Sequence, residues 1–120
     1  KDNHLTDNIN IVKATKKAKQ KYLNIDIEIE VDTREQLEDA LNSSATSILL
    51  DNFKPGKLKE IIAYIRSHPK GGNKYIELSG GITETTLKDF CISGINGISM
   101  GALTHHIKSK DISLDIQPHK

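Results

Sequence analysis

Acidic and glycine-rich residues recur at intervals of about 25 residues along the chain. They are Glu30, Asp51, the run Ser79, Gly80 and Gly81, and Gly101. Glycine-containing loops can bind an anion, because unpaired backbone N–H groups reach it without an intervening Cβ. Carboxylates near a bound phosphate can bind ribose hydroxyls, hold Mg²⁺ through water or stabilise developing positive charge. Glycosyl or phosphoribosyl transfer needs all of these, since its transition state spreads positive charge over the sugar.

Each of these features also has a purely structural interpretation. An Asp at the end of a strand often caps the helix that follows, and two consecutive glycines often form a turn. A single carboxylate can pair with a lysine for structural reasons. The residues alone therefore leave phosphate binding and plain turn chemistry both open at Gly80 and Gly81, and a structural ion pair open at Glu30 or Asp51.

The elements that would position these residues follow from periodicity. Strands are predicted at Ile25–Val31, Ser47–Asp51, Tyr75–Ser79 and Gly97–Gly101. A helical pattern follows each of the four strands and another, Leu5–Lys21, precedes them. The clearest helix begins near Pro55 and carries one apolar stripe, made of Leu58, Ile61, Ile62 and Ile65.

Two local signals refine the other helices. Thr33 and Gln36 form a capping-box pattern that predicts a helix start. Thr83 is expected to cap a later helix, in which Cys91 faces the core with an inert thiol.

Alternating helices and strands predict an α/β fold with four parallel βα units. Either an open doubly wound sheet or part of an α/β barrel fits, and a complete eight-unit barrel needs about 200 to 250 residues. In the first strand, isoleucines alternate with Asp26, Glu28 and Glu30. The isoleucines are expected to meet the helices and the acids to face a barrel lumen, the alternative being an edge strand with one wet face.

Composition excludes several classes of protein. A net charge of +1 with 28% charged residues lacks the excess of positive charge that is typical of a nucleic-acid-binding domain. No apolar run is long enough to span a bilayer and no leader opens the sequence, so we expect neither a membrane protein nor a secreted one. With Cys91 as the single cysteine, we expect a cytoplasmic domain. The chain begins at Lys1 and its single methionine is Met100, so we interpret it as a fragment of a longer protein.

Five motifs, in this order and spacing, resemble the C-terminal half of the quinolinate phosphoribosyltransferase family. They are Lys1–His4, Ile27–Val31, Ile48–Phe53, Glu77–Ile82 and Ile98–His105. The resemblance covers nearly all of residues 1–120 and implies the C-terminal half of an α/β barrel. It places an N-terminal sandwich domain and the first barrel strands upstream of Lys1, with the cationic residues that clamp quinolinate.

The resemblance implies quinolinate and phosphoribosyl pyrophosphate as substrates, with nicotinate mononucleotide, pyrophosphate and CO₂ as products of a step in NAD biosynthesis. It also implies Mg²⁺ and a homodimer. Lys1, Glu30 and Asp51 would be catalytic, and the two acids would also approach the metal, possibly through water. The phosphate would bind at the two loops formed by Ser79, Gly80, Gly81, Gly101 and Ala102.

Because the clamping residues lie upstream, we expect this chain alone to be inactive. Two other functions stay open. One is a paralogous member of the family with a different substrate, such as the molybdenum-transport-associated proteins. The other is a noncatalytic barrel fragment that binds phosphate.

Overall fold

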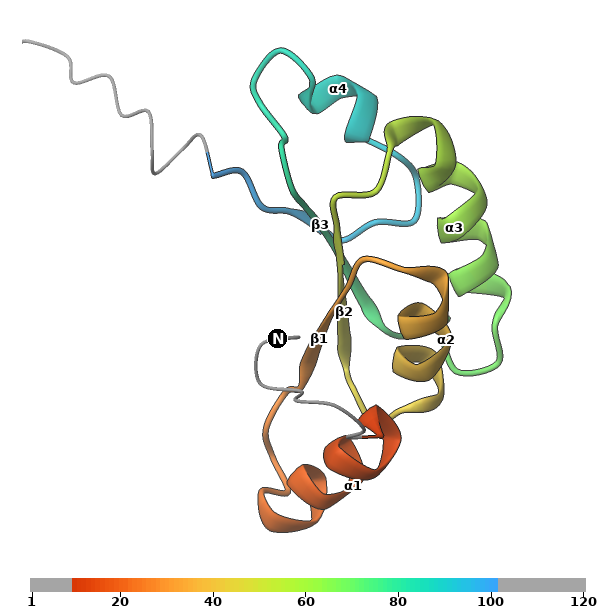
Figure 1. Ribbon diagram of the computed structural model, residues 1–120, viewed down its shortest axis with the longest axis vertical. Helices are drawn as coiled ribbons and strands as arrows, with labels where there is room; N and C mark the ends of the chain where they lie inside the picture. Colours follow the sequence, from red (N-terminus) through yellow and green to blue (C-terminus); the bar gives the residue numbers. More distant parts are fainter. Residues whose placement is uncertain (1–9, 102–120) are drawn as a thin grey trace, which may run out of the picture.

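Helices and strands alternate in the computed structural model, which describes residues 10–101 (Figure 1). The elements are α1 (Ile11–Lys21), β1 (Glu28–Val31), α2 (Arg34–Asn42), β2 (Ser47–Asp51), α3 (Pro55–Ser67), β3 (Tyr75–Ser79), α4 (Leu87–Phe90) and β4 (Gly97–Ile98). The predicted limits of β2 and β3 are confirmed. Within residues 10–101, no helix combines the length and the apolar character needed to cross a membrane.

The four strands form one parallel sheet in the order β1-β2-β3-β4. α2, α3 and α4 lie on one side of it, α1 lies beyond the amino ends of the strands and packs against α2, and the opposite side carries no helix of the described chain (Figure 1). A doubly wound sheet would reverse its strand order and place helices on both faces. Sequential order with one helical layer is the geometry of a barrel wall. The predicted α/β fold of four parallel βα units is therefore confirmed, and the arrangement favours the barrel over the doubly wound sheet.

Three element boundaries differ from the predictions. β1 begins at Glu28 because its partner strand begins at Ser47, which pairs with Glu28. β4 ends at Ile98, since the register with β3 covers only two pairs. α1 begins at Ile11 because the Asn10 side chain accepts hydrogen bonds from the N–H groups of Val12 and Lys13 and caps the helix there. Residues 5–9 of the predicted helix lie outside the described residues.

The core lies between the sheet and the helices. Alternate strand residues are buried against the helical layer: Ile29, Val31, Ile48, Leu50, Ile76 and Leu78. The facing helices contribute a second buried set, Leu37, Ala40, Leu41, Leu58, Ile62 and Ile65. Thus the predicted stripe of α3 is inward, except for Ile61, which is only partly buried. The capping signal also holds, since the Thr33 hydroxyl accepts a hydrogen bond from the Gln36 N–H at 3.2 Å.

The prediction for Cys91 is wrong. The helix before it, α4, ends at Phe90, so Cys91 follows the last helical residue and is exposed. The segment that begins at Thr83 first makes a turn, in which the Thr83 carbonyl accepts from the N–H groups of Thr86 and Leu87. This turn delays the helix to Leu87 and leaves it only one turn long.

The Arg66 guanidinium ties the end of α3 to the starts of β3 and β4. It donates to the carbonyls of Gly71, Gly72 and Lys74 at 3.3, 3.0 and 2.8 Å. It also donates to the Gly94 carbonyl at 2.9 and 2.5 Å and to Asn96 Oδ1 at 2.8 Å. A single side chain thus satisfies backbone acceptors from two loops at the amino end of the sheet.

We predict that Arg66→Met lowers the free energy of unfolding by about 2 kcal/mol, because the partly buried carbonyls of Gly71 and Lys74 lose a charged donor. Urea unfolding followed by circular dichroism measures this. Arg34→Met is the matched control: Arg34 pairs with Glu60 at 3.6 Å on an exposed surface, so its loss should cost less than about 1 kcal/mol. Equal effects of the two substitutions would contradict the proposed role of Arg66.

Candidate functional site

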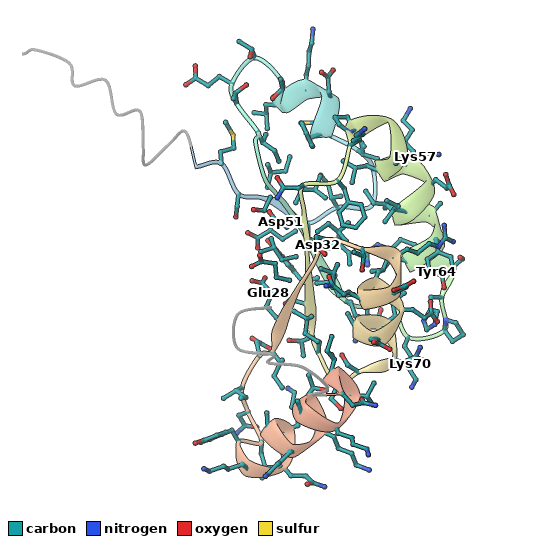
Figure 2. The ribbon with its side chains drawn as sticks, in the orientation of Figure 1. Glu28, Asp32, Asp51, Lys57, Tyr64 and Lys70 are labelled. Atoms are coloured by element: carbon teal, nitrogen blue, oxygen red, sulfur yellow. The ribbon has the colours of Figure 1, made fainter. Side chains whose placement is uncertain are left out.

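The side of the sheet away from the helices carries the acids. Glu28 and Glu30 alternate with the buried residues of β1, as predicted. Leu49 of β2 pairs with Glu30 on one side and with Glu77 of β3 on the other, so the two glutamates lie at the same level of the sheet. Figure 2 shows Glu28 and Asp51 on this side, whereas Lys57 and Tyr64 lie on the helical side. The sheet therefore separates an acidic face from the core.

Mutual repulsion affects this acidic face. Burial, followed by the negative charges of Glu77 and Glu30, raises the pKa of the Glu28 carboxyl above its ordinary value. The folded protein therefore holds the Glu28 proton more tightly than the unfolded chain does. It follows that folding stability decreases as pH rises from about 4.5 through the folded-state pKa of Glu28.

Glu28→Gln should therefore stabilise the fold at neutral pH, by about 0.5 kcal/mol for such an exposed group. Near pH 3.5 the substitution should have little effect, because Glu28 is then largely protonated in both states. Urea unfolding at the two pH values tests this. The control is Glu84→Gln, at an exposed loop position, which should change stability equally little at both pH values. If Glu28→Gln changes stability by the same amount at pH 3.5 and pH 7, charge is not the cause of its effect.

Asp51, Ser79 and Gly80 lie together at the carboxyl ends of β2 and β3. Asp51 is in register with Ser79, and both are the last residues of their strands. Asn52, the next residue, donates its backbone N–H to the Ser79 carbonyl at 3.0 Å. The structure thus brings together three of the residues singled out in the sequence.

Glu30 is on the same face as Asp51, in the edge strand β1, and lies farther from the carboxyl end of the sheet. It pairs with Leu49, which precedes Asp51 by two residues and therefore points to the same side. The two carboxylates are then separated by one strand spacing and by roughly 7 Å along the strand direction. Both are half-buried.

The Gly80–Gly81 loop does not begin a helix, and this corrects the sequence prediction. The turn from Thr83 to Thr86 separates it from α4. Both glycines have positive φ, 94° and 64°, which favours glycine. A Cβ on Gly81 would meet no atom within 4 Å, so the loop is open at Gly81, whereas Gly80 packs against Asn52. Any anion there would contact the loop's own N–H groups rather than a helix N-terminus.

Glu77 is held by the strand next to it. Its carboxylate accepts a hydrogen bond from the Ser99 hydroxyl. Ser99 continues β4, where its N–H donates to the Leu78 carbonyl at 2.8 Å. This hydrogen bond connects β3 to the segment that follows β4, and no pattern in the sequence predicted it.

The remaining predicted residues are placed less fully. Gly101 is an exposed turn residue beyond β4. Lys1 and Ala102 lie outside the described residues.

The donor set suits a hard cation. Glu30 and Asp51 present carboxylate oxygens, which Mg²⁺ prefers, and Mg²⁺ sites commonly combine one or two carboxylates with substrate phosphates and water. Among residues 10–101, no group of three or more His, Cys, Asp or Glu side chains is arranged to hold a metal. These residues therefore fit a magnesium ion held together with a phosphorylated substrate.

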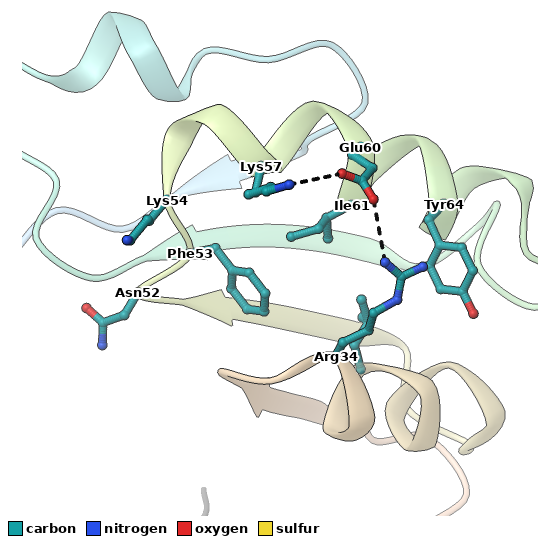
Figure 3. Close-up of a pocket in the computed structure, with 9 residues that line it drawn as sticks. Arg34, Asn52, Phe53, Lys54, Lys57, Glu60, Ile61 and Tyr64 are labelled. Carbon is teal, nitrogen blue, oxygen red and sulfur yellow. Dashed lines mark ion pairs between the residues drawn. The ribbon is translucent and has the colours of Figure 1, made fainter.

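A separate cavity of about 340 Å³ lies on the helical side, between α2 and α3 (Figure 3). Phe53, Ile61 and Tyr64 contribute to its walls. At its border Glu60 pairs with both Arg34 and Lys57, at 3.6 and 3.7 Å. The one acid of this cavity, Glu60, is engaged by two cations, and Glu30 and Asp51 lie on the other side of the sheet. We therefore place the candidate site at the carboxyl ends of β2 and β3, which we call the rim.

Comparison with protein families gives one match over most of the chain. Residues 1–115 match the family model described as quinolinate phosphoribosyl transferase, C-terminal domain. A probable nicotinate-nucleotide pyrophosphorylase [carboxylating] from Methanocaldococcus jannaschii is 40% identical over 119 residues. The human nicotinate-nucleotide pyrophosphorylase [carboxylating] is 33% identical over 117 residues. Each alignment covers 97% of this chain, but 42% and 39% of the respective relative.

Solved structures give the same result. The nicotinate-nucleotide pyrophosphorylase from Francisella tularensis superposes with a TM-score of 0.79 and 34% sequence identity. The superposition covers 91% of this chain and 38% of that structure. The chain therefore spans about two fifths of the length of these relatives.

Proposed function

Because the chain belongs to the quinolinate phosphoribosyl transferase family, we propose that it forms the C-terminal part of the barrel domain of a carboxylating nicotinate-nucleotide pyrophosphorylase. Such an enzyme transfers the phosphoribosyl group of phosphoribosyl pyrophosphate to quinolinate. The products are nicotinate mononucleotide, pyrophosphate and CO₂, in NAD biosynthesis.

The observation that carries this proposal is the rim where β2 and β3 end. Asp51 and Ser79 end adjacent strands in register, and the open Gly80–Gly81 loop follows directly. A 5-phosphate or pyrophosphate group needs accessible N–H donors, and the glycine loop offers them without side-chain obstruction. The ribose then lies near the acids, where developing positive charge is stabilised by Asp51 and Glu30.

In this proposal each residue has a distinct role. Asp51 and Glu30 stabilise the cationic sugar and contact Mg²⁺, directly or through water. Ser79, Gly80, Gly81, Gly101 and Ala102 hold phosphate, and Lys1 acts near the substrate carboxylate and pyrophosphate. When bound, Mg²⁺ neutralises pyrophosphate charge and so aids its departure.

The test is product formation by a full-length protein that carries these 120 residues. With Mg²⁺, quinolinate and phosphoribosyl pyrophosphate, nicotinate mononucleotide and CO₂ should appear in equal amounts. Turnover of another aromatic acid but not quinolinate would favour the paralogous function. Phosphate binding without any turnover would favour the noncatalytic one.

We further propose that the full-length enzyme is a homodimer, as the resemblance implies, and that it is cytoplasmic, as the composition with its single cysteine suggests. Sedimentation equilibrium of the full-length protein tests the dimer.

A further inference from the structure

Asn52 has an unusual backbone conformation immediately after Asp51. Its φ is 57°, and it is the one non-glycine residue with positive φ within residues 10–101. Side chains rarely adopt this left-handed region, although Asn tolerates it better than most. Strained positions of this kind cluster at functional sites, which makes the contacts of Asn52 informative.

The Asn52 side chain reaches back to the preceding carboxylate. Its amide Nδ2 donates to Asp51 Oδ2 at 2.9 Å. A carboxylate can only accept, so the amide nitrogen is necessarily the donor. The contact engages one oxygen of Asp51, and among residues 10–101 the other accepts no hydrogen bond.

Asn52 also packs against the glycine loop. Its N–H donates to the Ser79 carbonyl, and a Cβ on Gly80 would lie only 2.6 Å from the Asn52 nitrogen. Gly80 therefore permits a close approach that any other residue would block. One residue thus contacts both the acid and the loop proposed to hold phosphate.

We propose that Asn52 is a positioning residue that orients the Asp51 carboxylate relative to the Gly80–Gly81 loop. This inference rests on the proposed function. The left-handed backbone turns the amide toward Asp51 and holds the chain against Gly80. Asn52 contacts no substrate in this proposal and acts through Asp51.

Two substitutions separate the backbone from the side chain. Asn52→Gly keeps access to positive φ but removes the amide donor, whereas Asn52→Ala removes the donor and adds backbone strain. In a full-length protein carrying this chain, Asn52→Gly should lower kcat at least tenfold, with the KM for quinolinate and the melting temperature nearly unchanged. Asn73→Gly, at an exposed turn position away from the rim, is the control and should leave kcat unchanged.

A double-mutant cycle tests whether the effect passes through Asp51. When Asp51 is already Asn, adding Asn52→Gly should lower kcat less than twofold further. A full tenfold loss in that background would overturn the inference, as would an unchanged kcat in the single Asn52→Gly variant. In this chain itself, NMR should show that Asn52→Gly shifts the Asp51 carboxyl carbon and the Gly80 amide; unshifted resonances would also overturn it.

The outcomes distinguish this inference from the proposed function. If the unmodified full-length protein makes no nicotinate mononucleotide, the proposed function is wrong. If the unmodified protein is active and Asn52→Gly is equally active, only the role of Asn52 is wrong.

Discussion

Asp51→Asn in a full-length protein should lower kcat by about two orders of magnitude, the cost of one preorganised electrostatic contact. The amide has the size of the carboxylate and can still accept the hydrogen bond from Asn52, but it carries no charge. If Asp51 stabilises positive charge that develops on the ribose, the loss should fall on kcat more than on KM. Steady-state kinetics with both substrates measures this.

The matched control for Asp51→Asn is Asp39→Asn. Asp39 is exposed on α2, on the helical side of the sheet. The same change in charge there should leave kcat unaffected. Circular dichroism and thermal unfolding verify the fold of both variants. Native structure with unchanged kcat and KM in Asp51→Asn would reduce Asp51 to a strand-end residue with a structural role.

Residues 1–120 alone should turn over quinolinate at least a thousandfold more slowly than a full-length protein, because positioning of two substrates contributes about 7 to 11 kcal/mol in well-oriented reactions. This chain spans about two fifths of its relatives. The family resemblance places the cations that clamp quinolinate in the remainder. Nicotinate mononucleotide formation by the isolated chain, with its fold verified by NMR, measures the difference.

Full-length Asp51→Asn is the reference variant for that assay, because it keeps the cations that bind quinolinate and lacks the Asp51 carboxylate. Activity of residues 1–120 close to that of the intact protein would show that the essential groups are all within this chain. Recovery of activity on adding the remaining part of the protein would support the division of roles.

Features that depend on residues close together in the sequence were predictable. The stripe of α3 and the capping signal of Thr33 and Gln36 depend on residues a few positions apart, so neighbours in the sequence determine them. The alternation of Glu28, Ile29 and Glu30 in β1 is also local, and it predicts which side of the sheet carries the acids without knowledge of the partner strand. Four strand–helix repeats were then enough to predict the parallel sheet.

Contacts between strands could be seen only in the tertiary structure. The approach of Asn52 to Gly80 and the bond from Ser99 to Glu77 both join neighbouring strands, and their geometry depends on register. The exposure of Cys91 depends on where α4 ends, which the preceding turn at Thr83 decides. The sequence therefore determined that Asp51 and Ser79 end their strands and which side of the sheet the acids face, because both follow from periodicity. The structure decided how the rim residues are joined, because strand pairing brings together side chains whose mutual orientation no local pattern encodes.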